Sequence, residues 1–365
     1  MRDRVRRIFS KVPDDVNVIV LQNSVAAHVD MSFFHATDLV AGGGFERSVA
    51  VLRRDGSIDL AVPLLEETSA KRAPDATVTT YTKADERKAF LENACRGEAK
   101  VGVHQDELVA SDYLALKETL GHAALVDVSR PLADARAVKD RVELDRMRKA
   151  ARIVTEVADS IPSMLREGLK EFELAAEINY QMQRRGASGP SFDTIVGFKD
   201  GSAEPHYHPA EVALRKGEFV LCDFGAYYHR YASDLTRTFV YGQPSKEMRD
   251  MVDTCLRAHE AAIQAVKAGV KGGEVHNAAA AVIDVSPWKG RFIHSVGHSL
   301  GLAVHDGPAL SPRYDWTLEE NMVVTIEPGI YVPGIGGVRI EDDVVVTRDG
   351  CEYLTHARKD NWLVA

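Results

Sequence analysis

The segment LCDFGAYYHRYASDLTRT, residues 221–238, holds two acidic residues, Asp223 and Asp234, among residues that favour buried strands. A buried carboxylate is costly unless it is ion-paired, protonated or bound to a metal. A hairpin with Tyr228 and His229 as its two-residue loop would place Asp223 directly opposite Asp234, with Cβ atoms about 4.5–5.5 Å apart. Like charges at that separation are destabilising unless something neutralises them. The pair therefore predicts a site that compensates two negative charges.

A second pair of acids has the same arrangement downstream. Glu327 and Glu341 are centred on Gly334, which lies in the turn-forming run VPGIGG. A hairpin centred there sets the two glutamates opposite each other. Four carboxylates that converge in a sheet core would need roughly two divalent cations.

Three histidines lie between the two hairpins, in FIHSVGHSLGLAVHDGP (residues 292–308): His294, His298 and His305. His294 and His298 have the spacing of a helical zinc motif, but Ser295 stands where that motif has its glutamate, and the glycines argue against a helix. One histidine can still be a single metal ligand while the others contact substrate. Carboxylates with one imidazole suit Mn²⁺, Co²⁺ or Zn²⁺. Any one of these residues alone is more often structural, and only the joint pattern predicts a metal site.

Composition restricts the class of protein. The 365 residues suit two domains, and 45 basic against 54 acidic residues, a net charge of −9, argue against a nucleic-acid binder. The four cysteines are scattered without a Cys-x-x-Cys pair, which indicates a reducing compartment. No apolar run approaches the ~20 residues of a membrane span, and the basic N-terminus lacks the apolar region of a secretory signal. We therefore expect a cytoplasmic protein that binds neither membrane nor nucleic acid.

The elements that must position these residues divide the chain near residue 137. Residues 1–137 alternate strand and helix signals, with a hairpin over 48–63 around the turn pair Asp55-Gly56. A long helical stretch over 133–165 links this α/β domain to the second domain, residues 138–365. There, hairpins alternate with helices. This order predicts an α+β domain with helices on one face of a mostly antiparallel sheet.

Four motifs of the second domain, DFGAYYHRYASDLTRT, VGHSLGLAVHD, TIEPGIY and GVRIEDD, together resemble those of the pita-bread dinuclear metallopeptidases. The resemblance covers 138–365 and implies a pita-bread (creatinase/aminopeptidase-like) catalytic domain. Residues 1–137 resemble the smaller N-terminal α/β domain of the branch that cleaves Xaa-Pro bonds, the prolidases and aminopeptidases P. A kinase, which the isolated Asp-Phe-Gly at residues 223–225 spells, lacks its other motifs here.

The resemblance also implies a catalytic centre. Two divalent ions, Mn, Co or Zn, would hold a hydroxide between them that attacks the scissile carbonyl, with Asp234 and Glu341 bridging both ions. Glu327 would in addition act as the proton shuttle. Thr236 would orient Asp234 from behind. The metal ligands implied by the resemblance are Asp223, Asp234, His298, Glu327 and Glu341.

Further residues are assigned by the same resemblance. His206, in EPHYHP, and His305 would be catalytic residues that also contact the substrate. His294 would lie nearby as a substrate contact. Arg339 would contact substrate and hold the acidic ligands in place.

The resemblance implies a Xaa-Pro dipeptidase (prolidase), a homodimer that acts on small peptides with proline at the second position. One departure keeps an alternative open: where many prolidases have an arginine for the dipeptide carboxylate, this chain has Ala309, with Arg313 or Arg47 as possible substitutes. The alternative is a Xaa-Pro aminopeptidase (aminopeptidase P) acting on longer peptides. An alternative of another class is a non-catalytic pita-bread binding module, although such relatives typically lack ligands that are all present here.

Overall fold

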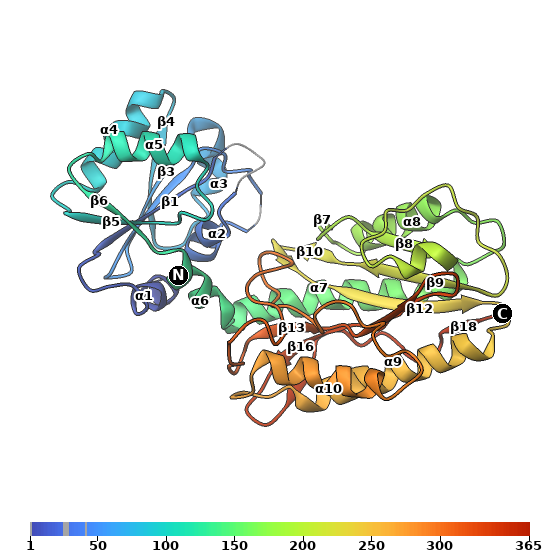
Figure 1. Cartoon of the computed structure of the whole chain (residues 1–365). Coiled ribbons are helices and arrows are strands. Elements are labelled where there is room, and N and C mark those ends of the chain that lie inside the picture. The colour runs from blue at the N-terminus through green and yellow to red at the C-terminus, as the bar shows by residue number, and fades with distance from the viewer. Residues whose placement is uncertain (1, 25–28, 41) are drawn as a thin grey trace. The chain divides into compact units, whose positions relative to one another are not determined.

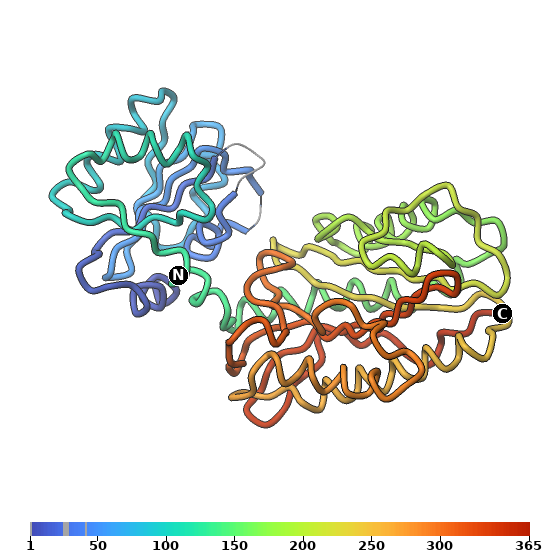
Figure 2. The backbone as a smooth tube through the Cα atoms, viewed as in Figure 1, coloured from blue at the N-terminus to red at the C-terminus, as the bar shows by residue number. Residues whose placement is uncertain are grey.

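The chain forms two compact units, Met1–Arg136 and Ala137–Ala365, in a computed structural model that describes residues 2–24, 29–40 and 42–365. The chain completes the first unit before it enters the second and does not return (Figure 2). No helix of the described residues is long and apolar enough to cross a membrane.

The first unit is built on one six-stranded mixed sheet with strand order β4-β3-β2-β1-β5-β6 (Figure 1). The predicted hairpin over 48–63 is confirmed, because Val49 pairs with Ala61 and Leu52 with Ile58 across the Asp55-Gly56 turn. The core lies between the sheet and helices α4 and α5. Its elements are α1 (Arg2–Phe9), β1 (Val18–Gln22), α2 (Met31–Thr37), β2 (Val49–Arg53), β3 (Ile58–Pro63), η1 (Leu64–Glu66), α3 (Glu67–Ala70), β4 (Ala76–Tyr81), α4 (Ala84–Ala94), β5 (Lys100–Val103), α5 (Ala110–Thr119), β6 (Ala124–Asp127) and α6 (Ser129–Ala137).

The predicted single helical stretch over 133–165 is wrong, because the chain breaks it into two helices. Val138 makes an antiparallel bridge with Met322, which draws the backbone out of the helix after Ala137. Asp140 then begins α7 with a capping box: its side chain accepts the Glu143 N–H, and the Glu143 carboxylate accepts the Asp140 N–H. This stop and restart fixes where the second unit begins its first long helix.

The second unit carries four long helices and a set of short, mostly antiparallel sheets. Its helices are α7 (Arg141–Ser160), η2 (Ile161–Ser163), α8 (Glu171–Arg184), η3 (Lys199–Ala203), α9 (Lys246–Ala265) and α10 (Gly272–Asp284). Its strands are β7 (Gly189–Pro190), β8 (Ile195–Phe198), β9 (Glu218–Phe224), β10 (Ala226–Tyr228), β11 (Tyr231–Ala232), β12 (Leu235–Tyr241), β13 (Val323–Ile326), β14 (Gly329–Val332), β15 (Gly336–Arg339), β16 (Asp342–Val346), β17 (Cys351–Tyr353) and β18 (Leu363–Val364).

Two apolar cores flank the strands of this unit. One joins α7 and α8 to β8, β9 and β12, and the other joins α9 and α10 to β13–β16. In Figure 1, α9 and α10 lie side by side on the opposite side of the strands from α8. The α+β class is confirmed, but the helices form two pairs on separate sheets and do not all cover one face. The strands between the two cores carry the polar residues of interest.

Candidate metal centre and active site

The hairpin of β9 and β12 brings Asp223 and Asp234 to one face, although the predicted pairing is wrong. Asp223 pairs with Thr236 and Phe224 with Leu235, so Asp234 does not lie directly opposite Asp223. The loop consists of His229 and Arg230, one residue later than expected, as the pairing of the flanking tyrosines in β10 and β11 shows.

Two observations explain this register. His229 and Arg230 have φ values of 49° and 63°, and the favoured two-residue hairpin turn with right-handed twist requires positive φ at both positions. Moving the loop by one residue shifts each cross-strand pair by two positions. Because strand side chains alternate with a period of two, a shift of two keeps Asp223 and Asp234 on the same face, as diagonal neighbours.

The second hairpin has the predicted register. Ile326 pairs with Asp342 on one side and Gly329 with Arg339 on the other. Glu327 and Glu341 lie between these two pairs, one on each strand, where the ladder is interrupted. The prediction that this hairpin is centred on Gly334 is confirmed.

His298 presents one bare ring nitrogen to the acids. Its Nδ1 lies 3.2 Å from the carbonyl oxygen of Ser299, which can only accept a hydrogen bond, so in the neutral ring Nδ1 carries the hydrogen. The unprotonated Nε2 lies 3.5 Å from Asp234 Oδ2 and 3.7 Å from Glu327 Oε1. A histidine that binds a metal usually has this arrangement, in which one ring nitrogen donates to a backbone carbonyl and the other is left for the metal.

One pocket of about 440 Å³ in the second unit collects the acids and histidines of both hairpins. Ser191, Phe192, Ile195 and Tyr227 add a partly apolar wall. The nine residues to which the resemblance assigns a metal or substrate role line this pocket: His206, Asp223, Asp234, His294, His298, His305, Glu327, Arg339 and Glu341. Ligand donors of Asp234, His298 and Glu341 all lie within 4.8 Å of one another, whereas Arg313, offered above as a carboxylate receptor, does not line the pocket.

Burial and mutual repulsion act strongly on the acids. Burial first, and then the charge of Asp223, raise the pKa of Asp234 well above its usual range. Burial and Asp234 likewise raise the pKa of Glu341, and burial raises the pKa of Glu327. Without a cation, these groups hold their protons to higher pH than ordinary carboxyls, so the site is arranged for a positive charge that the protein itself supplies only in part.

Arg339 and Thr236 hold the acids from behind. Arg339 donates from Nη2 to Asp223 Oδ2 at 2.5 Å and from Nε to Thr236 Oγ1 at 3.0 Å. Thr236 donates onward to Glu341 Oε2 at 2.6 Å, so it orients Glu341 and not, as expected, Asp234. Asp234 instead donates its own N–H to Asp343 Oδ2 at 3.0 Å. Arg339 is thereby engaged with the ligand set.

The other histidines differ in how free their rings are. His294 contacts the carbonyl of Ser295 at 2.7 Å and the hydroxyl of Tyr331 at 2.8 Å, so both of its nitrogens are occupied. Burial and the charge of Arg339 lower the pKa of His294 to about 3. The His305 ring lies edge-on to His298 with centroids 4.2 Å apart, and burial and His298 lower the pKa of His305 to about 4. Both rings are neutral near neutral pH.

Sequence reasoning missed two residues of this network. Tyr331 accepts a hydrogen bond from Arg339 Nη1 at 2.8 Å and touches His294, and nothing in TIEPGIY distinguishes its hydroxyl from that of an ordinary core tyrosine. Asp343 was also missed. Its signal was present, since three consecutive acids, residues 341–343, begin an otherwise apolar strand.

With this geometry in view, comparison with known proteins identifies the family. Residues 145–348 match the model of metallopeptidase family M24, and residues 31–138 match the creatinase/prolidase N-terminal domain. The Xaa-Pro dipeptidase of Pyrococcus furiosus is 33% identical over 336 residues, which are 92% of this chain and 93% of that protein. The chain belongs to metallopeptidase family M24 and is a metallopeptidase by descent.

Solved structures agree. A Xaa-Pro dipeptidase from Bacillus anthracis superposes with a TM-score of 0.90 at 32% identity, covering 99% of both chains. An X-Pro aminopeptidase from Thermotoga maritima gives a TM-score of 0.86 at 30% identity, covering 96% of this chain and 98% of that one. The predicted pita-bread fold with a creatinase-type N-terminal domain is confirmed.

Proposed function

We propose that this protein is a metal-dependent Xaa-Pro dipeptidase. The observation that carries the proposal is the convergence of five candidate ligands in one pocket of a chain similar throughout its length to Xaa-Pro dipeptidases. The ligands are Asp223, Asp234, His298, Glu327 and Glu341. We further propose the division at residue 137 as the boundary between an N-terminal domain and this catalytic domain.

The residues present fit a pair of divalent ions. Oδ1 of Asp223 and Oδ1 of Asp234 are buried and lack a hydrogen-bond partner among the described residues. Burying such atoms without a partner costs free energy, and a cation held by these carboxylates would remove that cost. Carboxylates with one imidazole favour Mn²⁺, Co²⁺ or Zn²⁺, and we propose two such ions per chain.

In the proposed mechanism the ions, when bound, would acidify a water molecule and stabilise the developing oxyanion. Glu327 would take up a proton from that water and deliver it to the departing proline nitrogen. Its carboxylate lines the pocket and lies 3.7 Å from His298 Nε2, so it is placed among the other candidate ligands, where the water would be held. His206 and His305 line the same pocket and would orient the scissile carbonyl through hydrogen bonds.

One observation favours the alternative, a Xaa-Pro aminopeptidase. Of the described residues that line the pocket, Arg339 is the only arginine or lysine, and it is engaged with Asp223 and Thr236. Ala309 forms a backbone bridge with His298. Its side chain is only a methyl group, which cannot bind a dipeptide carboxylate. A longer peptide has no carboxylate at this position and would not need a cation there.

A substrate comparison separates the two activities. The purified protein, loaded in turn with Mn²⁺, Co²⁺ and Zn²⁺, is assayed on a Xaa-Pro dipeptide and on the matching Xaa-Pro-Yaa tripeptide. Faster hydrolysis of the dipeptide supports the dipeptidase, and faster hydrolysis of the tripeptide supports the aminopeptidase. Cleavage of neither peptide with any of the metals contradicts both. Metal analysis then tests the binding-module alternative, which predicts no uptake.

Oligomeric state and location stay predictions. We propose that the protein is a homodimer. We also propose a cytoplasmic location, which agrees with the free state of all four cysteines, each of which lies in the described part of the chain. Sedimentation of the purified protein tests the first point.

A further inference from the structure

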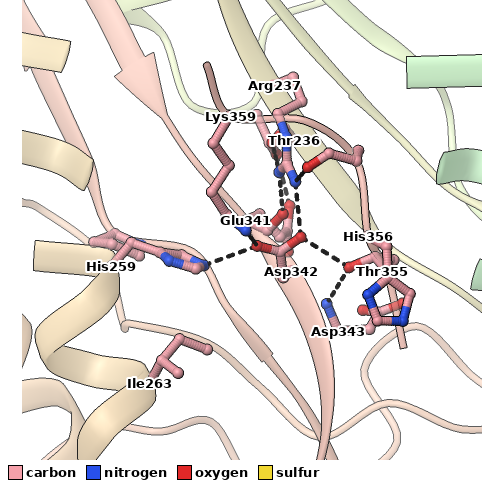
Figure 3. Close-up of polar contacts among 12 residues, drawn as sticks. Thr236, Arg237, His259, Ile263, Glu341, Asp342, Asp343, Thr355, His356 and Lys359 are labelled. Atoms are coloured by element: carbon pink, nitrogen blue, oxygen red, sulfur yellow. Dashed lines mark hydrogen bonds and ion pairs between the residues drawn. The ribbon is translucent and has the colours of Figure 1, made fainter. Parts of the chain in front are cut away.

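The two acids that follow Glu341 are completely buried. Asp342 and Asp343 are both fully buried, at 0% exposure, immediately after a candidate ligand. Charged groups so placed survive only with dedicated partners. Their partners come from β12 and α9, both much earlier in the sequence, and from residues 355–359, which follow shortly after the pair (Figure 3).

Asp342 is surrounded on both carboxylate oxygens. Its Oδ1 accepts hydrogen bonds from Arg237 Nη2 at 2.8 Å and from Thr355 Oγ1 at 3.0 Å. Its Oδ2 lies 2.7 Å from Lys359 Nζ and 3.1 Å from His259 Nε2 of α9. Figure 3 shows these four side chains converging on the one carboxylate.

Arg237 uses all five of its N–H groups in this cluster. Nη1 donates to the carbonyls of Thr236, at 2.9 Å, and of Glu341, at 2.5 Å. Nη2 donates to Asp342 and to the Ala357 carbonyl, and Nε donates to the Arg358 carbonyl. One guanidinium thus fixes the backbone of the Glu341 strand to β12 and to the segment 355–359.

Asp343 extends the network to the other hairpin. Its Oδ2 accepts the backbone N–H of Asp234 at 3.0 Å, and its own N–H donates to Thr355 Oγ1 at 3.0 Å. The hydroxyl of Thr355 therefore accepts from Asp343 and donates to Asp342. Thr355 itself is fully buried. Its hydroxyl thus connects the carboxylate of Asp342 to the backbone of Asp343.

We propose that Thr355, together with Arg237, is a positioning residue for the metal centre. The proposal rests on the proposed function, in which Asp234 and Glu341 are ligands of the metal ions. Asp343 holds the backbone N–H of Asp234, and Arg237, which is itself bonded to Asp342, holds the backbone carbonyl of Glu341. The Thr355 hydroxyl connects Asp342 to the backbone of Asp343. The carboxylates of Asp234 and Glu341 are thereby held in place relative to each other, although they come from different hairpins.

The Thr355 hydroxyl can be removed with almost no change of shape. Thr355→Val replaces it with a methyl group and loses both hydrogen bonds, whereas Thr355→Ser keeps the hydroxyl and loses only a methyl group. Metal-free protein of each kind is titrated with Mn²⁺ in a calorimeter, and the visible absorption of the Co²⁺ form is recorded. We expect T355S to bind like the wild type, and T355V to bind about tenfold more weakly or worse with an altered Co²⁺ spectrum, as for other partners behind metal ligands.

A second matched pair covers the case in which T355V does not fold. Lys359 and Arg358 are adjacent cations, with side chains 30% and 61% exposed, but the Arg358 side chain pairs with the exposed Asp360, whereas Lys359 reaches Asp342. We expect Lys359→Met to weaken Mn²⁺ binding about two- to fivefold and Arg358→Met to leave it unchanged.

The outcomes are distinct. If T355V folds, its Mn²⁺ affinity tests the proposal. If T355V does not fold, the comparison of K359M with R358M tests it. A purely structural role predicts that T355V or K359M lowers the melting temperature of the metal-free protein but binds Mn²⁺ with unchanged affinity, and that result overturns the proposal. A wild-type protein that takes up no metal overturns the proposed function, and this proposal with it.

Discussion

At the scale of single residues, Asp234 and Glu341 differ from the other candidate ligands in the number of ions that each would touch. If both bridge, Asp234→Asn or Glu341→Gln removes a ligand from two ions at once, whereas His298→Ala removes one ligand from one ion. We expect the first two variants to retain almost no metal and H298A to retain about one ion per chain, as measured by elemental analysis after dialysis.

The corresponding loss of activity for D234N or E341Q should exceed the roughly 10- to 100-fold effect typical of a residue behind the ligands. Asp360→Asn, in an exposed ion pair with Arg358, serves as a control that should change neither quantity. Equal and mild losses in all three ligand variants would contradict the bridging assignment.

A pH prediction follows from the same residues. Burial and like charge raise the pKa values of Asp234 and Glu341 in the metal-free protein, so these groups hold protons to higher pH than ordinary carboxyls. Metal ligands must be ionised, so metal uptake must release those protons. The sign is therefore an affinity that increases with pH until these groups are ionised without metal.

Calorimetric titration with Mn²⁺ in two buffers of different ionisation enthalpy measures this release directly. A heat of binding that is independent of the buffer would show that no proton leaves, and that the carboxyls are already ionised when the site is empty.

At the scale of elements, Gly225 is the tightest point of the β9–β12 hairpin. A Cβ there would lie 2.0 Å from Ser191 Oγ and 2.1 Å from the Ser233 carbonyl oxygen. Gly225→Ala should therefore push apart the strands that carry Asp223 and Asp234. We expect a loss of about 1–3 kcal/mol in the free energy of unfolding, measured by denaturant titration, together with weaker Mn²⁺ binding.

Gly189→Ala is the matched control, since a Cβ at Gly189 meets no atom within 4 Å. It should change stability by less than about 0.5 kcal/mol. If G225A were as stable as G189A, the close approach at Gly225 would have no energetic consequence.

The same hairpin shows what the sequence could and could not predict. The shared face of Asp223 and Asp234 was predictable, because any shift of the strand pairing by an even number of residues keeps both side chains on one face. The site could therefore be predicted although the loop was not. The loop itself was not predictable, because His229 and Arg230 are not typical residues for positive φ and tertiary contacts must hold them there. The second hairpin was easier to predict, because the turn-forming residues around Gly334 mark its centre and so determine its register.

The supporting contacts lay further beyond reach of the sequence. Arg237, Thr355 and Asp342 meet although more than 100 residues separate Arg237 from the other two. Their types are ordinary, and no local pattern announces a contact of that range. Motifs could therefore identify the ligands, while the residues that hold the ligands required the three-dimensional structure.

At the scale of the whole molecule, the described lining of the candidate site comes from the second unit. All residues that line the pocket lie within Ala137–Ala365, and each unit has a hydrophobic core of its own. A ligand that binds only the folded form stabilises the part that binds it. We expect scanning calorimetry to show two transitions, of which chelation of the metal lowers one and leaves the other in place.

An equal shift of both transitions, or a single transition with and without chelator, would show instead that the two units unfold as one. The assignment of each transition can be checked with T355V, which should lower only the transition that responds to metal.

The hydrogen bonds between Arg339, Tyr331 and His294 have a fixed direction. Because the Ser295 carbonyl can only accept, His294 carries its hydrogen on Nδ1, and Tyr331 must donate to Nε2 while it accepts from Arg339. The dipoles of these groups are therefore aligned head to tail, and none can be reversed without leaving a neighbour unpaired. The NMR resonances of the His294 ring nitrogens should show this single tautomer with and without metal. They would therefore report whether this wall of the pocket stays rigid when metal binds.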